Sequence, residues 1–177
     1  MTSPNDFLTW ISNRLHQDPT FNPPWEKDIP KDIISKFDLV LKRNVSVRKA
    51  RQYHFYKIIP SDLNIEYASQ LAYDREIVMN IKSTFFKMIP DYLVFFYVTD
   101  KYIPVGILGH LADFNKVRKK IMGNVFQINV LLETEKGTYL SPQKIGIWGW
   151  GILSHLKNDI RDTILEPFRV WQQELSY

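Results

Sequence analysis

The chain has 177 residues, a formal net charge of +4 and no cysteine, which excludes disulfides and thiolate metal sites. Hydrophobic residues make up 45% and aromatic residues 14% of the sequence, so a packed core is favoured over disorder. The excess of Lys and Arg indicates an anionic partner, either nucleic acid or a membrane surface. The first residues do not follow the signal-peptide pattern, and no apolar run reaches transmembrane length. We therefore expect an intracellular protein, in the cytoplasm or at the inner membrane face.

Residues 1–32 are predicted to form an N-terminal amphipathic helix and a proline-rich arm. Ser3 is a suitable helix cap, and apolar residues recur at helical spacing until about His16. Four prolines between positions 17 and 31 then predict an extended segment, because proline fixes φ and lacks a backbone donor.

Residues 33–177 are predicted to form a single α+β domain, with a mainly antiparallel sheet packed against helices. The expected strands are 37–42, 52–59, 92–98, 102–108, 125–133 and 137–140, with 145–150 as a strand or strained loop. The expected helices are 64–89 (capped by Ser61 or Asp62), 112–122, 152–166 (bent or ended by Pro167) and 168–175. Residues 92–108 and 125–140 are each expected to be a hairpin.

The tetrapeptide Asn22-Pro23-Pro24-Trp25 has three interpretations. Methyltransferases that modify amino groups of nucleic acids use an Asn-Pro-Pro-aromatic peptide, but they also need a glycine-rich cofactor loop, which this sequence lacks. A proline-rich peptide can be presented to a partner protein or a second copy. It can also be a connector whose Trp25 packs onto the domain.

Other catalytic patterns are weak, so no cofactor and no enzymatic activity are expected. Four side chains share one predicted helix face and could in principle hold a divalent metal, although a solvated charged face has the same pattern; they are His155, Asp159, Asp162 and Glu166. The other histidines are scattered, and no nucleophile elbow or Walker loop occurs.

Two clusters of basic residues are the predicted binding sites for an anionic partner. The first is interleaved with aromatic residues and comprises Lys42, Arg43, Arg48, Lys49, Arg51 and Lys57. The second lies on the predicted helix 112–122 and comprises Lys116, Arg118, Lys119 and Lys120. Basic groups attract phosphates, and aromatic rings can stack on bases or lie at a lipid interface. A hairpin with its aromatic side chains in the core and its cations in water is the alternative.

The uncharged run 145–153 contains Trp148 and Trp150 among three glycines. Its tryptophans are interpreted as core residues, a lipid-interface wedge or a self-association patch. Together with Pro23, Pro24 and Trp25, they are the candidate self-association residues.

The layout resembles that of the small rhabdovirus matrix proteins, in which a proline-bearing arm precedes a basic α+β domain. The arm of that family often carries a Pro-Pro-x-Tyr peptide, and Pro23-Pro24-Trp25 is similar in placement, with Asn22 in place of the first proline and Trp25 in place of the tyrosine. The resemblance implies self-assembly, binding to nucleocapsid or RNA, peripheral attachment to an anionic membrane and presence in a virion. The alternative is a cytoplasmic nucleic-acid-binding accessory protein of a bacterium or mobile element.

Overall fold

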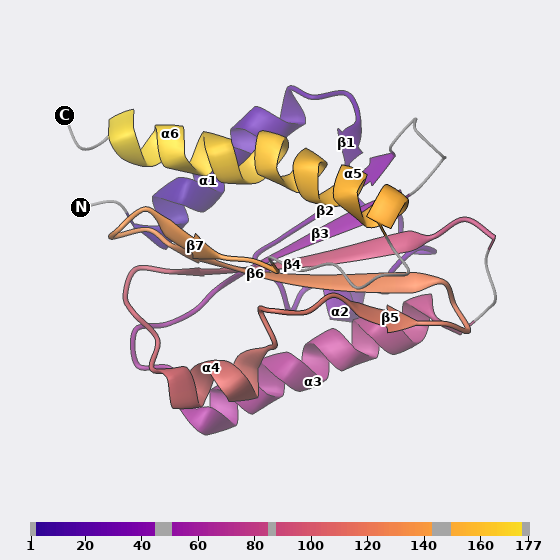
Figure 1. The fold of residues 1–177 in the computed structure, drawn as a ribbon, viewed down its shortest axis with the longest axis horizontal. Coiled ribbons are helices and arrows are strands. Elements are labelled where there is room, and N and C mark those ends of the chain that lie inside the picture. Colours follow the sequence, from indigo (N-terminus) through magenta and orange to yellow (C-terminus); the bar gives the residue numbers. More distant parts are fainter. Residues whose placement is uncertain (1–2, 45–50, 85–87, 143–149, 175–177) are drawn as a thin grey trace.

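The structure is a computed structural model that describes residues 3–44, 51–84, 88–142 and 150–174. A seven-stranded sheet in this part of the chain is covered by helices on both faces (Figure 1). The strands are β1 (Phe21–Asn22), β2 (Leu39–Asn44), β3 (Arg51–Ile58), β4 (Asp91–Thr99), β5 (Arg118–Lys120), β6 (Val125–Glu133) and β7 (Thr138–Leu140). The helices are α1 (Pro4–His16), α2 (Lys31–Ile34), α3 (Ile65–Lys82), α4 (Val105–Leu111), α5 (Trp150–Ile160), the π-helix η3 (Arg161–Leu165) and α6 (Glu166–Glu174).

The sheet has the strand order β1-β2-β3-β4-β6-β5, and β7 also pairs with β6. The α+β prediction is confirmed, but the sheet is mixed: β3 pairs with β4, and β4 with β6, in parallel. The remaining pairs are antiparallel. Parallel strands need a crossover connection, and α3 and α4 lie in the two crossovers.

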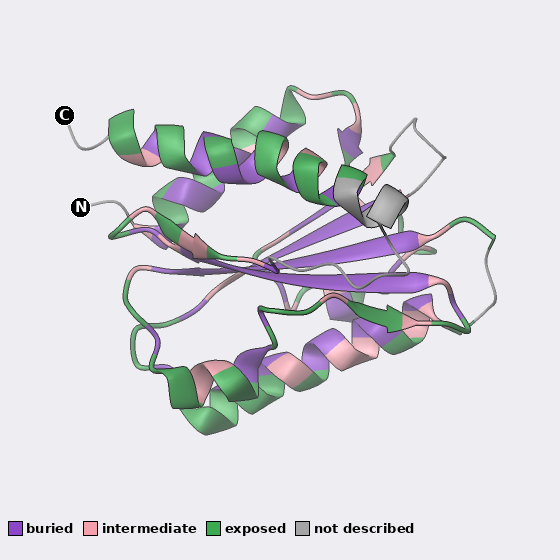
Figure 2. Cartoon of the chain, in the orientation of Figure 1, coloured by how far each residue is buried: buried purple, intermediate pink, exposed green. Residues whose placement is uncertain are grey.

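Strand β4 lies between two hydrophobic cores and contributes side chains to both. All nine of its residues are buried, because helices cover both faces of the sheet (Figure 2). Phe95 stacks on Phe55 at 4.7 Å in the core beside α3, and Phe96 stacks on Tyr56 at 4.6 Å in the core beside α1 and α6. Adjacent residues therefore contribute to opposite cores, as the pleat of a strand requires.

The N-terminal helix is confirmed, and its cap explains where it begins. The Ser3 hydroxyl accepts a hydrogen bond from the Asp6 backbone N–H, and the Asp6 carboxylate accepts one from the Ser3 backbone. The Ser3 hydroxyl and the Ser3 backbone N–H both donate to the Asp6 carboxylate, and these two hydrogen bonds lower the pKa of Asp6. Phe7 and Ile29 are fully buried, so both parts of the N-terminal segment 1–32 contribute to the cores of the domain.

Two predicted elements are wrong. Residues 102–108, expected to be a strand, contain the start of α4, which follows Pro104. Residues 112–122, expected to be a helix, contain the edge strand β5. Proline immediately before a helix is compatible with its first turn, and the lysines of β5 suit an exposed sheet edge, where charge discourages further pairing.

Two helix boundaries also differ from the prediction. Asn64, rather than Ser61 or Asp62, caps α3 by accepting a hydrogen bond from the Tyr67 backbone, and α3 ends at Lys82. The C-terminal helix continues through Pro167, preceded by the wider turn η3. The Glu166 N–H bonds to the Arg161 carbonyl, five residues back, which alters the hydrogen-bond ladder immediately before the proline.

Candidate interaction surface

Four large apolar side chains are exposed at one end of the molecule and are here called the apolar tip. The exposed fractions are 90% for Met88, 39% for Ile89, 80% for Ile121 and 76% for Met122. Their two loops meet, because the Asn124 side-chain amide donates to the Met88 carbonyl. These residues were not predicted from the sequence, although each pair stands directly beside turn-forming residues, Pro90 or Gly123-Asn124.

The turn from Ile121 to Asn124 holds the side chains of Ile121 and Met122 away from the core. The Asn124 N–H donates to the Ile121 carbonyl at 3.1 Å, and Asn124 has a φ of 49°, a conformation that asparagine tolerates. A Cβ on Gly123 would lie 2.3 Å from the Cα of Ser83, so the turn contacts the end of α3 closely. This contact sets the turn against the helix and leaves Ile121 and Met122 in solvent.

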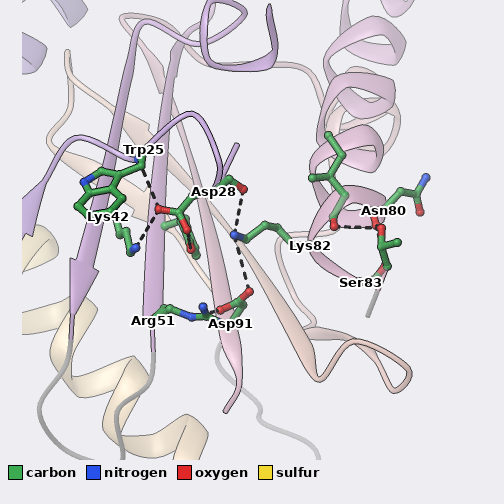
Figure 3. Close-up of polar contacts among 11 residues, drawn as sticks. Trp25, Asp28, Lys42, Arg51, Asn80, Lys82, Ser83 and Asp91 are labelled. Atoms are coloured by element: carbon green, nitrogen blue, oxygen red, sulfur yellow. Dashed lines mark hydrogen bonds and ion pairs between the residues drawn. The ribbon is translucent and has the colours of Figure 1, made fainter. Parts of the chain in front are cut away.

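A buried charged cluster lies beneath the tip and is here called the ionic platform (Figure 3). Asp91 is fully buried and pairs with Arg51 at 2.7 Å and Lys82 at 3.8 Å. Lys82 also donates to the Asp28 carbonyl, and the Asp28 carboxylate pairs with Lys42 at 2.9 Å. The Asp91 backbone N–H donates to the Asn124 carbonyl, which connects the platform to the turn.

The platform joins the N-terminal segment to the sheet electrostatically. Burial disfavours the charged form of Asp28, but the hydrogen bond and charge of Lys42, together with the charge of Lys82, outweigh it, so the pKa of Asp28 is lowered. The Lys82 ammonium also lies 3.9 Å from the centre of the Tyr53 ring. Buried charges are tolerated only when paired in this way.

The second basic cluster lies on and before β5, beside the tip (Figure 2 shows most of β5 and the start of the following turn as exposed). Lys119 lies over the Phe126 ring, and Lys120 donates to the Asn80 side chain, so in the described part of the chain both contact neutral groups. Arg118 pairs with Glu76, and Lys116 with Asp113 at 3.9 Å. Among the described residues, the positive charge adjoining the tip therefore comes mainly from Lys119 and Lys120.

The first basic cluster is spread over β2 and β3, and its described members pair with carboxylates. Lys42 pairs with Asp28, Arg43 with Asp159, Arg51 with Asp91, and Lys57 with Asp38. Arg48 and Lys49 lie outside the described residues. The aromatic side chains Tyr53, Phe55 and Tyr56 are fully buried in the cores. Binding of an anion by this cluster stays a prediction.

Among the candidate self-association residues, Trp25 is 63% exposed, with the Lys27 ammonium 4.1 Å from its ring centre. Its backbone forms a turn in which Asp28 and Ile29 donate to the Trp25 carbonyl. Pro23 is exposed and Pro24 is half-buried. Trp148 and the side chain of Trp150 lie outside the described residues.

The acids of the C-terminal helix point to different partners. Asp159 accepts from Arg43 and Gln52, Asp162 pairs with Arg161, and Glu166 with Arg169. His155 is exposed. No cluster of three potential metal ligands occurs among the residues that the structure describes.

A buried polar chain continues from Asp159 into the core. Gln52 donates to Asp159 at 2.8 Å, and its side-chain oxygen lies 3.1 Å from His54 Nε2. His54 is fully buried between the rings of Phe21 and Phe96. Burial, assisted by the charge of Arg43, lowers the pKa of His54 to about 3, so the ring is neutral at physiological pH.

No protein family, curated protein or solved structure matches this chain. Among the described helices, none combines the length and apolarity needed to cross a bilayer.

Proposed function

We propose that this is a non-enzymatic structural protein that attaches peripherally to an anionic membrane surface through the apolar tip and β5. The observation that carries the proposal is the exposure of Met88, Ile89, Ile121 and Met122 beside Lys119 and Lys120. Apolar side chains flanked by lysines suit the boundary between acyl chains and anionic headgroups.

The sizes of the expected free-energy contributions favour a lipid partner over a nucleic acid at this surface. Full burial of an Ile or Met side chain contributes about 1.5–3 kcal/mol, whereas a lysine near an anionic bilayer contributes about 1 kcal/mol. The apolar term is therefore the larger one, and an acyl interior can provide it whereas a nucleic acid cannot. RNA would gain little from the tip, because bases stack on aromatic rings and the tip has none.

Self-association and nucleocapsid binding complete the proposal. The exposed ring of Trp25 is available to a second copy. The resemblance to rhabdovirus matrix proteins implies self-assembly and nucleocapsid binding. A protein with these contacts would bridge nucleocapsid or RNA and the membrane. The competing function, a nucleic-acid-binding accessory protein, places Lys119 and Lys120 on phosphates and assigns no role to the tip.

Vesicle flotation tests the membrane contact. We expect the parent to float with phosphatidylserine-containing vesicles, and the triple variant Met88→Ser/Ile121→Ser/Met122→Ser to lose at least about tenfold in affinity, roughly 1.4 kcal/mol. The matched control Val105→Ser/Val170→Ser removes exposed apolar side chains elsewhere, 73% and 48% exposed in the parent, and should float like the parent.

A parallel RNA-binding assay separates the two functions. Under the membrane proposal, Lys119→Gln/Lys120→Gln weakens vesicle binding less than the tip variant does. The contrary result is a parent that binds RNA but not anionic vesicles, with RNA binding weakened only in the lysine variant. The protein would then be a nucleic-acid-binding protein, and the membrane proposal would be wrong.

A further inference from the structure

A cleft separates the C-terminal helix from the sheet on the face opposite α3 (Figure 1 shows this helix crossing the sheet). It has a volume of about 270 Å³. Ile128 and Val130 of β6 line it on one side, and Ile160 and Leu165 of the helix line it on the other. These four residues give the cleft an aliphatic part against which an alkyl chain can pack, and Tyr139 and Ser141 also line the cleft.

Two cations lie on the helical side of the same cleft. Lys157 and Arg161 are four residues apart and both line it, and no acidic side chain does so among the described residues. Arg161 pairs with its neighbour Asp162, but both side chains are at least half exposed, so the pair is weak and a second carboxylate can compete for it. The cleft thus combines an apolar wall with a positive edge.

The helix has an irregular turn at this point. Arg161 and Leu165, the first and last residues of the π-helix η3, both line the cleft. π-turns are rare and occur often at functional sites. Pro167 accounts for an irregularity in this part of the helix, and Arg161 and Leu165, four residues apart, both lie on its cleft-facing side.

We propose that the cleft binds a small aliphatic carboxylate, with its chain against Ile128, Val130 and Ile160 and its carboxylate beside Lys157 and Arg161. The volume lies just below the usual range for ligand pockets, about 300–1,000 Å³, so the ligand is short-chained. The carboxylate is specified by charge complementarity, since two cations and no described acid line the cleft. This binding is independent of the membrane contact at the tip.

Calorimetry with three eight-carbon probes, octanoate, 1-octanol and octylammonium, tests the proposal. They share an alkyl chain and differ in charge, so the walls bind them equally and the cations discriminate among them. We expect octanoate to bind the parent at least tenfold more tightly than octylammonium. Lys157→Gln/Arg161→Gln should remove this preference, whereas Arg14→Gln/Lys31→Gln, an equal loss of exposed charge elsewhere, should retain it.

Two filling variants locate the ligand. Val117→Trp and Ser141→Trp each place a large side chain at a position that lines the cleft, and whichever variant folds like the parent should lose octanoate binding. The apolar-tip variant should bind octanoate like the parent, which separates this site from the membrane contact. Failure of the parent to bind octanoate, equal affinity for all three probes, or unchanged octanoate binding by a folded filling variant would overturn the proposal.

Discussion

Asp91 is the residue whose environment is least apparent from the sequence. Its carboxylate has no exposed surface, and its partners Arg51 and Lys82 are 40 and 9 positions away along the chain. Each cation offsets part of the cost of removing the carboxylate from water, and removal of the acid would leave two cations at a buried site. The pairing depends on the β3–β4 register, in which Arg51 lies opposite Asp91.

The first prediction concerns that carboxylate. Asp91→Asn preserves the shape of the side chain but removes its charge, and we expect the free energy of unfolding in urea to fall by about 3 kcal/mol. The exposed, paired acid Asp162 provides the control, because Asp162→Asn should cost less than about 0.5 kcal/mol. A loss below about 1 kcal/mol for Asp91→Asn would show that the platform contributes little.

The second prediction concerns His54. Its pKa is about 3 in the folded protein, whereas the ordinary pKa of histidine, which applies to the unfolded chain, is 6.5. Between these two values the unfolded state binds a proton that the folded state does not. Stability therefore falls as pH decreases below about 6.5, and from pH 7 to pH 5 the loss is about 2 kcal/mol. Urea unfolding at pH values from 7 to 5 measures it.

Variants identify the titrating group. His54→Phe keeps an aromatic ring between Phe21 and Phe96 and should flatten the pH profile over this range. His110 is exposed, and His110→Gln should reproduce the parent profile. A profile that keeps its slope in His54→Phe would assign the titration to other groups.

At the scale of elements, the turn after β5 determines whether the tip is presented. Gly123→Ala places a Cβ against the Ser83 backbone, which cannot move aside as a flexible side chain can. We expect the unfolding free energy to fall by about 2 kcal/mol. Gly106→Ala in α4 meets no atom within 4 Å and should be neutral or slightly stabilising. Equal stabilities of the two variants would mean that the turn does not depend on this contact.

The sequence predicted the elements whose signals are local. The Ser3 cap of α1, strand β3 and the β6–β7 hairpin follow from adjacent residues. Prediction from the sequence failed where the conformation of a segment depends on which distant strand it pairs with. Residues 102–108 contain strand-favouring residues, and their assignment to a strand implied a β4 hairpin and concealed the parallel β4–β6 pair. The uninterrupted apolar run of β4 was the available signal for a central parallel strand.

The candidate surface was predicted only in part, for a related reason. The lysines of β5 were recognised because charge is visible in the sequence, although they were placed on a helix. The tip was missed, because Met88 and Ile121 are 33 positions apart and isolated apolar residues are ordinarily assigned to the core. The ionic platform joins five separate segments, namely the N-terminal segment, β2, β3, α3 and β4, and no spacing rule relates them.

For the whole molecule, the tip and Trp25 are separate exposed features that the proposed bridging function uses differently. Trp25→Ala removes an exposed ring but keeps the backbone turn, so the unfolding free energy should change by less than about 0.5 kcal/mol. Sedimentation velocity should show weaker self-association, because a tryptophan buried by a partner can act as a binding hot spot. A lower stability with unchanged association would make Trp25 an intramolecular anchor instead.

The central claim is that the apolar tip enters a membrane. Because the chain has no cysteine, Met122→Cys and Val105→Cys each create a unique site for an environment-sensitive fluorophore on a residue that is at least 73% exposed. On addition of phosphatidylserine-containing vesicles, we predict a blue shift and higher emission at position 122 and no change at position 105. The same shift at both positions, or no shift at position 122 while the protein floats with the vesicles, would contradict the account.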